Sequence, residues 1–151
     1  LRGSASHTER WTSGWRAEAR GSWQLSAQPL ISNEQFAIGG VDTVRGYLES
    51  AALGDNGVAL TLEATTPNFA KRFGDSVEDL RLLAFLDGGY VHVREPITAE
   101  DRTTLAGAGI GVRLKGWGGV SAGIDWAVAL KNLGKTERGD SRGHFRLGYE
   151  W

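Results

Sequence analysis

The sequence contains no cysteine and no methionine in 151 residues. Without cysteine there can be no disulfide framework, no thiol nucleophile and no thiolate-ligated metal. The longest apolar runs are only five residues, LLAFL (82–86) and WAVAL (126–130), whereas a membrane-spanning helix needs about 18 or more. The formal net charge of -1 gives no electrostatic reason to expect nucleic acid as a partner.

Signs of catalysis and of targeting are also missing. The three histidines, His7, His92 and His144, fall in unrelated segments without metal-ligand spacing, and no GxSxG nucleophile elbow occurs. We therefore expect neither an enzyme nor a bound metal or cofactor. The chain starts LRGSASHTER, without a methionine, a basic segment or an apolar signal region. This start predicts the interior of a longer protein, whose targeting cannot be read here.

What the sequence does contain is strict two-residue alternation. In WRAEARGSWQLSAQ (15–28), every second residue is Trp, Ala, Gly or Leu, and the residues between them are polar or charged. This pattern is typical of a β-strand with one apolar face. Alternation of this kind predicts an all-β protein with six strands, over residues 15–28, 58–66, 80–93, 103–115, 119–130 and 143–151. One helical turn is expected within 69–80.

One connection is much longer than the others. The link from Pro29 to Gly57 has 29 residues. Loops beyond about 12 to 15 residues are uncommon in compact domains and are usually functional. We therefore expect the function of the chain to involve this segment.

Alternation alone fits two kinds of barrel. A transmembrane β-barrel carries its apolar face outside, and a soluble ligand-binding barrel carries it inside. The polar phase of the strands is rich in charge, and each charge in the packed interior of a small soluble barrel would need a partner. The charged residues of this phase are Arg16, Glu18, Arg20, Arg113, Asp125, Arg146 and Glu150. Their number favours a wide, wet lumen, although the soluble barrel remains an alternative.

The end of the chain points the same way. Alternation continues to the last residue, with Phe145, Leu147, Tyr149 and Trp151 on one face. Soluble domains more often end in a frayed polar tail. A terminal strand that ends on an aromatic residue resembles the recognition signal of bacterial outer-membrane barrels.

Two further motifs resemble those of a known family. ISNEQFAIGGVDTVRGYLESAALGDNG (31–57) resembles the loop signature of the two-partner secretion transporters, the haemolysin secretion/activation family, with its EQF, GG and VRGY or VRGF elements in this order. LLAFLDGGYV (82–91) resembles the second barrel motif of that superfamily, with alternating aromatic, Asp and Gly, here Phe85, Asp87 and Gly89. Two motifs at compatible spacing make the resemblance specific.

The resemblance implies a sixteen-stranded transmembrane antiparallel β-barrel in the bacterial outer membrane, preceded by periplasmic domains. Residues 1–151 would be the C-terminal part of this barrel, with six strands, a lumen-inserted loop at 29–57 that starts outside the cell, and a last strand at 143–151 that ends in the periplasm. The implied function is translocation of an unfolded partner polypeptide, a haemolysin-like or adhesin-like exoprotein, to the cell surface. The implied partners are this passenger, outer-membrane lipid and the barrel-assembly machinery. An outer-membrane assembly insertase of the same superfamily remains an alternative.

The resemblance also implies a site. Its loop motif is Val44, Arg45, Gly46 and Tyr47, and Arg45 at the tip of the loop is expected to latch onto Asp87 of the wall. Arginine suits this role because its rigid guanidinium fork meets a carboxylate in two parallel hydrogen bonds.

Glycines are placed where such a contact needs them. Gly39, Gly40 and Gly46 are expected to permit a tight hairpin at the loop tip. Gly88 and Gly89 are expected to leave room beside the wall aspartate. We therefore expect close approach between the loop backbone and the strand.

Overall fold

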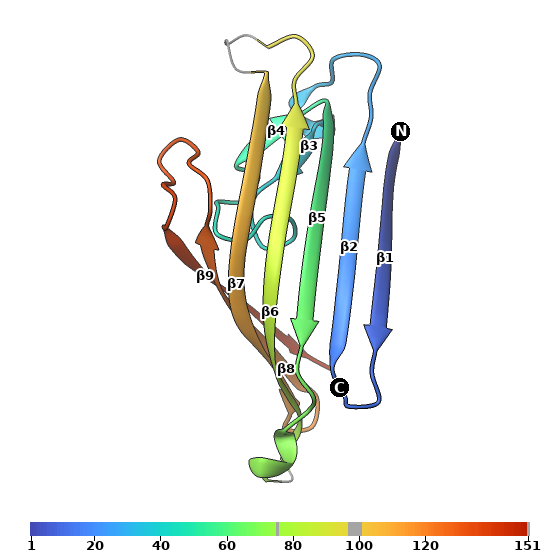
Figure 1. The fold of residues 1–151 in the computed structure, drawn as a ribbon, viewed down its shortest axis with the longest axis vertical. Coiled ribbons are helices and arrows are strands. Elements are labelled where there is room, and N and C mark those ends of the chain that lie inside the picture. The colour runs from blue at the N-terminus through green and yellow to red at the C-terminus, as the bar shows by residue number, and fades with distance from the viewer. Residues whose placement is uncertain (75, 97–100, 151) are drawn as a thin grey trace.

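The computed structural model describes residues 1–74, 76–96 and 101–150. Its main element is a seven-stranded antiparallel sheet in the order β1-β2-β5-β6-β7-β8-β9 (Figure 1). The strands are β1 (Arg2–Arg10), β2 (Arg16–Gln24), β5 (Asn56–Thr65), β6 (Val77–His92), β7 (Arg102–Gly116), β8 (Val120–Ala129) and β9 (Ser141–Tyr149). Neighbours in the sequence are therefore neighbours in the sheet, as in a barrel wall built by successive hairpins.

The connection between β2 and β5, residues 25–55, is called here the long loop. It contains a 3-10 turn, η1 (Ser32–Glu34), and a small two-stranded sheet formed by β3 (Phe36–Ile38) and β4 (Ala52–Gly54). In Figure 1 this segment lies behind β5 to β7, folded back along the sheet. The loop therefore covers one face of the sheet, which is its concave face, because β8 and β9 also curve toward that side.

All six strands predicted from the alternation are present, but the sheet has a seventh. Residues 2–10 pair with β2 along their whole length, from Arg2 opposite Gln24 to Arg10 opposite Arg16. The count of six was wrong because this strand lacks the expected pattern. On the face that β1 shares with Trp23, it carries Gly3, Ala5, His7 and Glu9.

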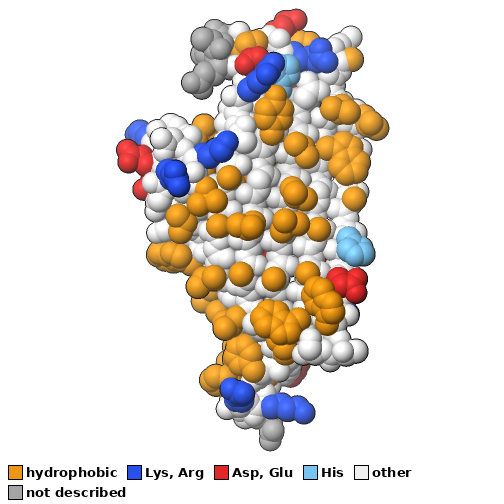
Figure 2. Space-filling model, in the orientation of Figure 1, with side chains coloured by type: hydrophobic (Ala, Val, Ile, Leu, Met, Phe, Trp, Pro, Cys, Tyr) orange, Lys and Arg blue, Asp and Glu red, His pale blue; other side chains and the backbone are white. Residues whose placement is uncertain are grey.

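The two faces of the sheet differ in chemistry. The convex face, which is toward the viewer in Figure 2, carries a broad band of hydrophobic side chains with charged residues above and below it. The large exposed side chains of this band are Trp23, Val58, Leu60, Leu62, Leu82, Leu86, Ile110, Ile124, Trp126, Phe145 and Leu147. The opposite phase of the strands holds most of the charged residues of the sheet, in agreement with the alternation of the sequence, and Glu9 of β1 is an exception on the convex face.

The buried core lies between the long loop and the concave face. Its largest cluster joins Ile38, Val44 and Tyr47 of the loop to Val91 of β6 and Leu105 of β7. A second, smaller cluster contains two residues of β6 and Ala127 of β8. The core is therefore not enclosed by the sheet itself, and the loop supplies three of the seven buried residues of the larger cluster.

The connection between β5 and β6 is longer than those between β1 and β2 and between β7 and β8. It contains the 3-10 turn η2 (Ala70–Arg72), so the helical turn predicted within 69–80 is present. The Asn68 side chain donates to the Glu78 carbonyl at 2.9 Å and accepts from the Leu80 backbone N–H at 3.0 Å. No helix in the described part of the chain has the length and hydrophobicity of a membrane span.

The exposed apolar face generates a prediction about solubility. Because the band is wide and the sheet ends in two open edges, β1 and β9, we expect the isolated chain to associate in water. Detergent should prevent this by covering the band. Size-exclusion chromatography with light scattering in the presence and absence of detergent measures it, and a stable monomer in plain buffer would contradict the expectation.

Candidate functional site

The tip of the long loop is a tight, glycine-rich turn. Gly39 and Gly40 have φ values of 105° and 98°, which lie in the left-handed region. The Gly40 N–H donates to the Val44 carbonyl at 3.1 Å, and the Thr43 hydroxyl donates to the Gly39 carbonyl at 3.1 Å. This turn directs the next residue, Arg45, toward the sheet.

Arg45 meets Asp87 of β6 in a two-pronged contact. Nε donates to Oδ2 at 2.7 Å and Nη2 donates to Oδ1 at 3.0 Å. The Arg45 backbone N–H also donates to Oδ2, at 3.1 Å. Arg45 is 2% exposed and Asp87 is 4% exposed. Parallel, charge-assisted bonds of this kind fix orientation as well as distance.

Three further groups surround the same guanidinium. Its Nη1 lies 3.5 Å from Oε2 of Glu63 on β5 and 3.6 Å from Oδ2 of Asp125 on β8. Its Cζ lies 3.3 Å from the centre of the Phe85 ring, in a cation–π arrangement. One arginine of the loop therefore contacts carboxylates from three different strands.

The carboxylates have other arginine partners on the wall. Arg113 of β7 binds Asp125 through two bonds, at 2.7 and 3.0 Å, and Arg146 of β9 approaches the same carboxylate at 3.4 Å. Arg20 of β2 lies 4.0 Å from Glu63. The charges on this part of the wall are thus closely balanced. We call Arg45, Glu63, Asp87, Asp125, Arg113, Arg146 and Arg20 the arginine–carboxylate cluster.

A row of glycines on β7 lets the cluster lie close to the wall. A Cβ at Gly107 would come within 2.1 Å of the Arg45 carbonyl oxygen, one at Gly109 within 2.5 Å of the Phe85 ring, and one at Gly111 within 2.1 Å of the Asp125 carboxylate. These glycines belong to the sequence AGAGIGV (106–112). Gly107 therefore leaves room for the loop backbone, and Gly109 and Gly111 leave room for the wall side chains Phe85 and Asp125, which contact Arg45.

Gly88 and Gly89, the two glycines predicted to make room beside Asp87, face opposite sides of the sheet. A Cβ at Gly89 would meet Val44 Cγ2 at 2.9 Å, so this glycine does make room for the loop. A Cβ at Gly88 would meet nothing within 4 Å. The expectation that Gly88 leaves room beside Asp87 was wrong, because adjacent residues of a strand point to opposite faces.

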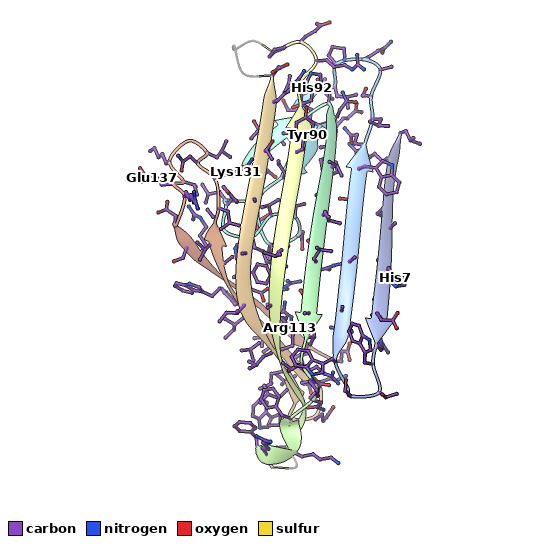
Figure 3. The ribbon with its side chains drawn as sticks, viewed as in Figure 1. His7, Tyr90, His92, Arg113, Lys131 and Glu137 are labelled. Carbon is purple, nitrogen blue, oxygen red and sulfur yellow. The ribbon has the colours of Figure 1, made fainter. Side chains whose placement is uncertain are left out.

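The other members of the loop motif also contact the wall. Val44 is buried in the core, and Gly46, with a φ of 98°, lies so close to β8 that a Cβ would be 2.9 Å from the Ala129 nitrogen. The Tyr47 hydroxyl accepts the Lys131 N–H at 3.0 Å and is 2.9 Å from the carbonyls of Ala106 and Lys131, to one of which it donates. Figure 3 shows Lys131 at the start of the connection between β8 and β9.

The base of the long loop has its own charged centre at Asp55, a residue that sequence reasoning missed. Asp55 is 1% exposed and accepts the backbone N–H groups of Leu30 and Arg94, both at 2.7 Å, and the Gln35 side chain at 3.2 Å. Burial acts to raise the pKa of Asp55, but these hydrogen bonds outweigh it and hold the pKa below its usual value. The contact therefore stabilises the loop base at neutral pH and is lost only in acid.

The EQF motif (residues 34–36) contacts Asp55 at the base of the long loop. The Gln35 side chain is one of the donors to Asp55, and the Phe36 ring covers Gly57, where a Cβ would approach it to 2.4 Å. Nothing in the sequence pairs these residues, because their contacts depend on how the loop folds. The signal that was available is their place within the 31–57 motif.

The apolar side chains of the terminal strand point away from these centres, although Arg146 of the same strand approaches Asp125. Phe145, Leu147 and Tyr149 are exposed on the convex side by 83%, 76% and 60%, and Trp151 lies outside the described residues. In the described part of the chain, no group of three or more His, Cys, Asp and Glu side chains is arranged to hold a metal ion.

The Tyr47 contact yields a test of how the loop is held. Tyr47→Phe removes one oxygen and leaves the partly buried Lys131 N–H without its acceptor, at a cost of about 1 kcal/mol. Hydrogen exchange at Lys131 should therefore become faster. Tyr90→Phe is the control, because Tyr90 lies in the phase of β6 that faces away from the loop. Equal protection of Lys131 in both variants would show that the hydroxyl does not fix the loop.

The family model "Haemolysin secretion/activation protein ShlB/FhaC/HecB" matches residues 1–114. Among solved structures, CdiB from Acinetobacter baumannii matches with a TM-score of 0.70 and 18% sequence identity, over 95% of this chain and 25% of that chain. A search of curated proteins gives no match.

The structural match shows a shared fold, and this chain spans about a quarter of the CdiB chain. The family match is broader evidence, because it covers more than half of the residues, including the long loop and Asp87. The chain therefore belongs to the haemolysin secretion/activation protein family ShlB/FhaC/HecB.

Proposed function

We propose that residues 1–151 are the C-terminal part of an outer-membrane β-barrel that translocates an unfolded partner polypeptide to the cell surface in two-partner secretion. The observation that carries this proposal is the docking of the long loop on a charged wall. Arg45 is buried among carboxylates of β5, β6 and β8, while the other face of the same strands is apolar. A sheet of this kind separates lipid from a polar conduit.

In this proposal the convex face contacts outer-membrane lipid, and the concave face lines the lumen. Charged and hydroxyl side chains would keep the conduit wet and give an extended passenger hydrogen-bonding surroundings without a strong apolar trap. No nucleotide is available at that membrane, so folding or capture of the passenger outside the cell would drive its movement. The passenger would be a haemolysin-like or adhesin-like exoprotein. The terminal strand would serve the barrel-assembly machinery as a recognition signal.

The family match favours secretion over the two alternatives. An assembly insertase shares the loop and wall motifs but works at the barrel seam. A soluble ligand-binding barrel would enclose its apolar face, whereas the large apolar side chains here are exposed on the convex side. The upstream domains discriminate further, since two periplasmic modules favour a secretion transporter and a longer series favours an insertase.

Arg45 and Asp87 are proposed to act as a latch that fixes the position of the loop. Arg45→Ala and Asp87→Ala should each impair secretion, because loss of one partner of a buried pair costs about 3 to 5 kcal/mol. Their effects should not add, since either change breaks the same contact. Secretion of the passenger by cells carrying each single and the double variant provides the measurement.

The charge-exchanged protein, Arg45→Asp with Asp87→Arg, provides a stricter version of this test. It should restore part of the secretion lost in the single variants, but not all, because the two side chains differ in reach. Fully additive losses in the double-alanine protein would mean that the two residues act separately, and the latch would have to be abandoned.

The orientation of the sheet is tested by spin labels in the membrane-inserted protein. Labels at Arg20 and Arg146, on the concave side, should be accessible to a water-soluble relaxation agent. Labels at Trp23 and Leu147, on the convex side, should be accessible to oxygen dissolved in lipid. The reversed pattern would mean that the sheet is inverted relative to this proposal.

A further inference from the structure

We propose that Asp55 is a positioning residue that clamps the base of the long loop, separately from the latch at its tip. The proposal rests on the proposed function, because it concerns how a secretion transporter holds its lumen loop. Asp55 lies between β4 and β5, where the long loop returns to the sheet. Its carboxylate is buried and is bound through both oxygens.

The donors to this carboxylate come from two separate segments, the outgoing arm of the long loop and the connection between β6 and β7. Oδ1 accepts from the Leu30 N–H, at the start of the long loop, and from the Gln35 side chain, just before β3. Oδ2 accepts from the Arg94 N–H, in the connection between β6 and β7. One side chain therefore joins the outgoing arm of the loop, its returning arm and the adjacent connection.

Neighbouring contacts reinforce the same junction. The Gln24 side chain, at the end of β2, donates to the Asp55 carbonyl at 3.2 Å and to the Glu34 carbonyl at 3.0 Å. The Arg94 guanidinium donates to the Ser26 carbonyl at 2.8 Å. These bonds connect the long loop to the end of β2 and to the segment that follows β6. The base of the loop is therefore held from two sides.

The base and the tip are held by different groups. Among the described residues, the hydrogen-bond partners of Asp55 include none from the arginine–carboxylate cluster. Loss of the Arg45 contact should therefore free the tip while the base stays attached. The loop would then pivot about its base and would not leave the lumen as a free chain.

Asp55→Asn tests this assignment with little change in volume. A carboxylate accepts at both oxygens, whereas the asparagine amide presents N–H groups toward at least one of the three donors. Asp42→Asn is the matched control, because Asp42 is an exposed carboxylate of the same loop. Both variants remove one negative charge, so only the local hydrogen bonds distinguish them.

The measurement is the distance distribution between pairs of spin labels in the complete membrane-inserted protein. One pair, at Ser32 and Leu60, reports the base, and another, at Leu48 and Ile110, reports the tip. In Asp55→Asn the narrow distribution of the base pair should be lost while that of the tip pair is kept. In Arg45→Ala the reverse is expected, and Asp42→Asn should retain both.

The proposal is overturned if Asp55→Asn keeps the base pair narrow or broadens both pairs equally. If that variant does not assemble into a barrel, Gln35→Ala, which deletes one donor only, must show the same selective loss at the base. These distances do not depend on passenger transport. A wild-type protein that secretes nothing would contradict the proposed function. The distances between the label pairs would still test the role of Asp55.

Discussion

The buried guanidinium of Arg45 constrains both the long loop and the wall. A charged group removed from water needs opposite charges and hydrogen bonds close by, or its burial costs several kcal/mol. Here the carboxylates come from β5, β6 and β8, so the loop can dock only where the strand register brings them together. The glycines of β7 meet the same requirement, because a side chain at Gly107 would collide with the Arg45 backbone and side chains at Gly109 and Gly111 would collide with Phe85 and Asp125, which contact Arg45.

A net stabilising effect is not the main consequence of such a cluster. Burial of an ion pair often contributes little to the free energy of unfolding, but removal of one partner is costly. The arrangement therefore specifies one position of the loop against many others. In a chain whose apolar residues face outward over much of the sheet, this specificity adds to the small buried core between the loop and the concave face.

Much of the wall could be predicted from the sequence, because a sheet with two different faces imposes a two-residue period. β1 escaped this reasoning, since its convex phase carries Gly3, Ala5, His7 and Glu9 in place of large apolar residues. The pairing of Arg45 with Asp87 was predicted from the resemblance of their two motifs to those of the family. The contacts of Glu63 and Asp125 could not be foreseen, because they depend on strand register. Asp55 lies within the 31–57 motif, but its contacts could not be foreseen, since two of its three donors are backbone groups whose position depends on how the loop folds.

The most direct test of the docked loop is a disulfide between loop and wall in living cells. Val44 Cγ2 lies 2.9 Å from the position of a Cβ at Gly89, so cysteines at Val44 and Gly89 should form a crosslink under mild oxidation. A matched pair at Val44 and Ile110, on the other face of the sheet, should not. Absence of the Val44–Gly89 crosslink, with both cysteines open to a membrane-impermeant maleimide, would show that the loop does not rest on the wall.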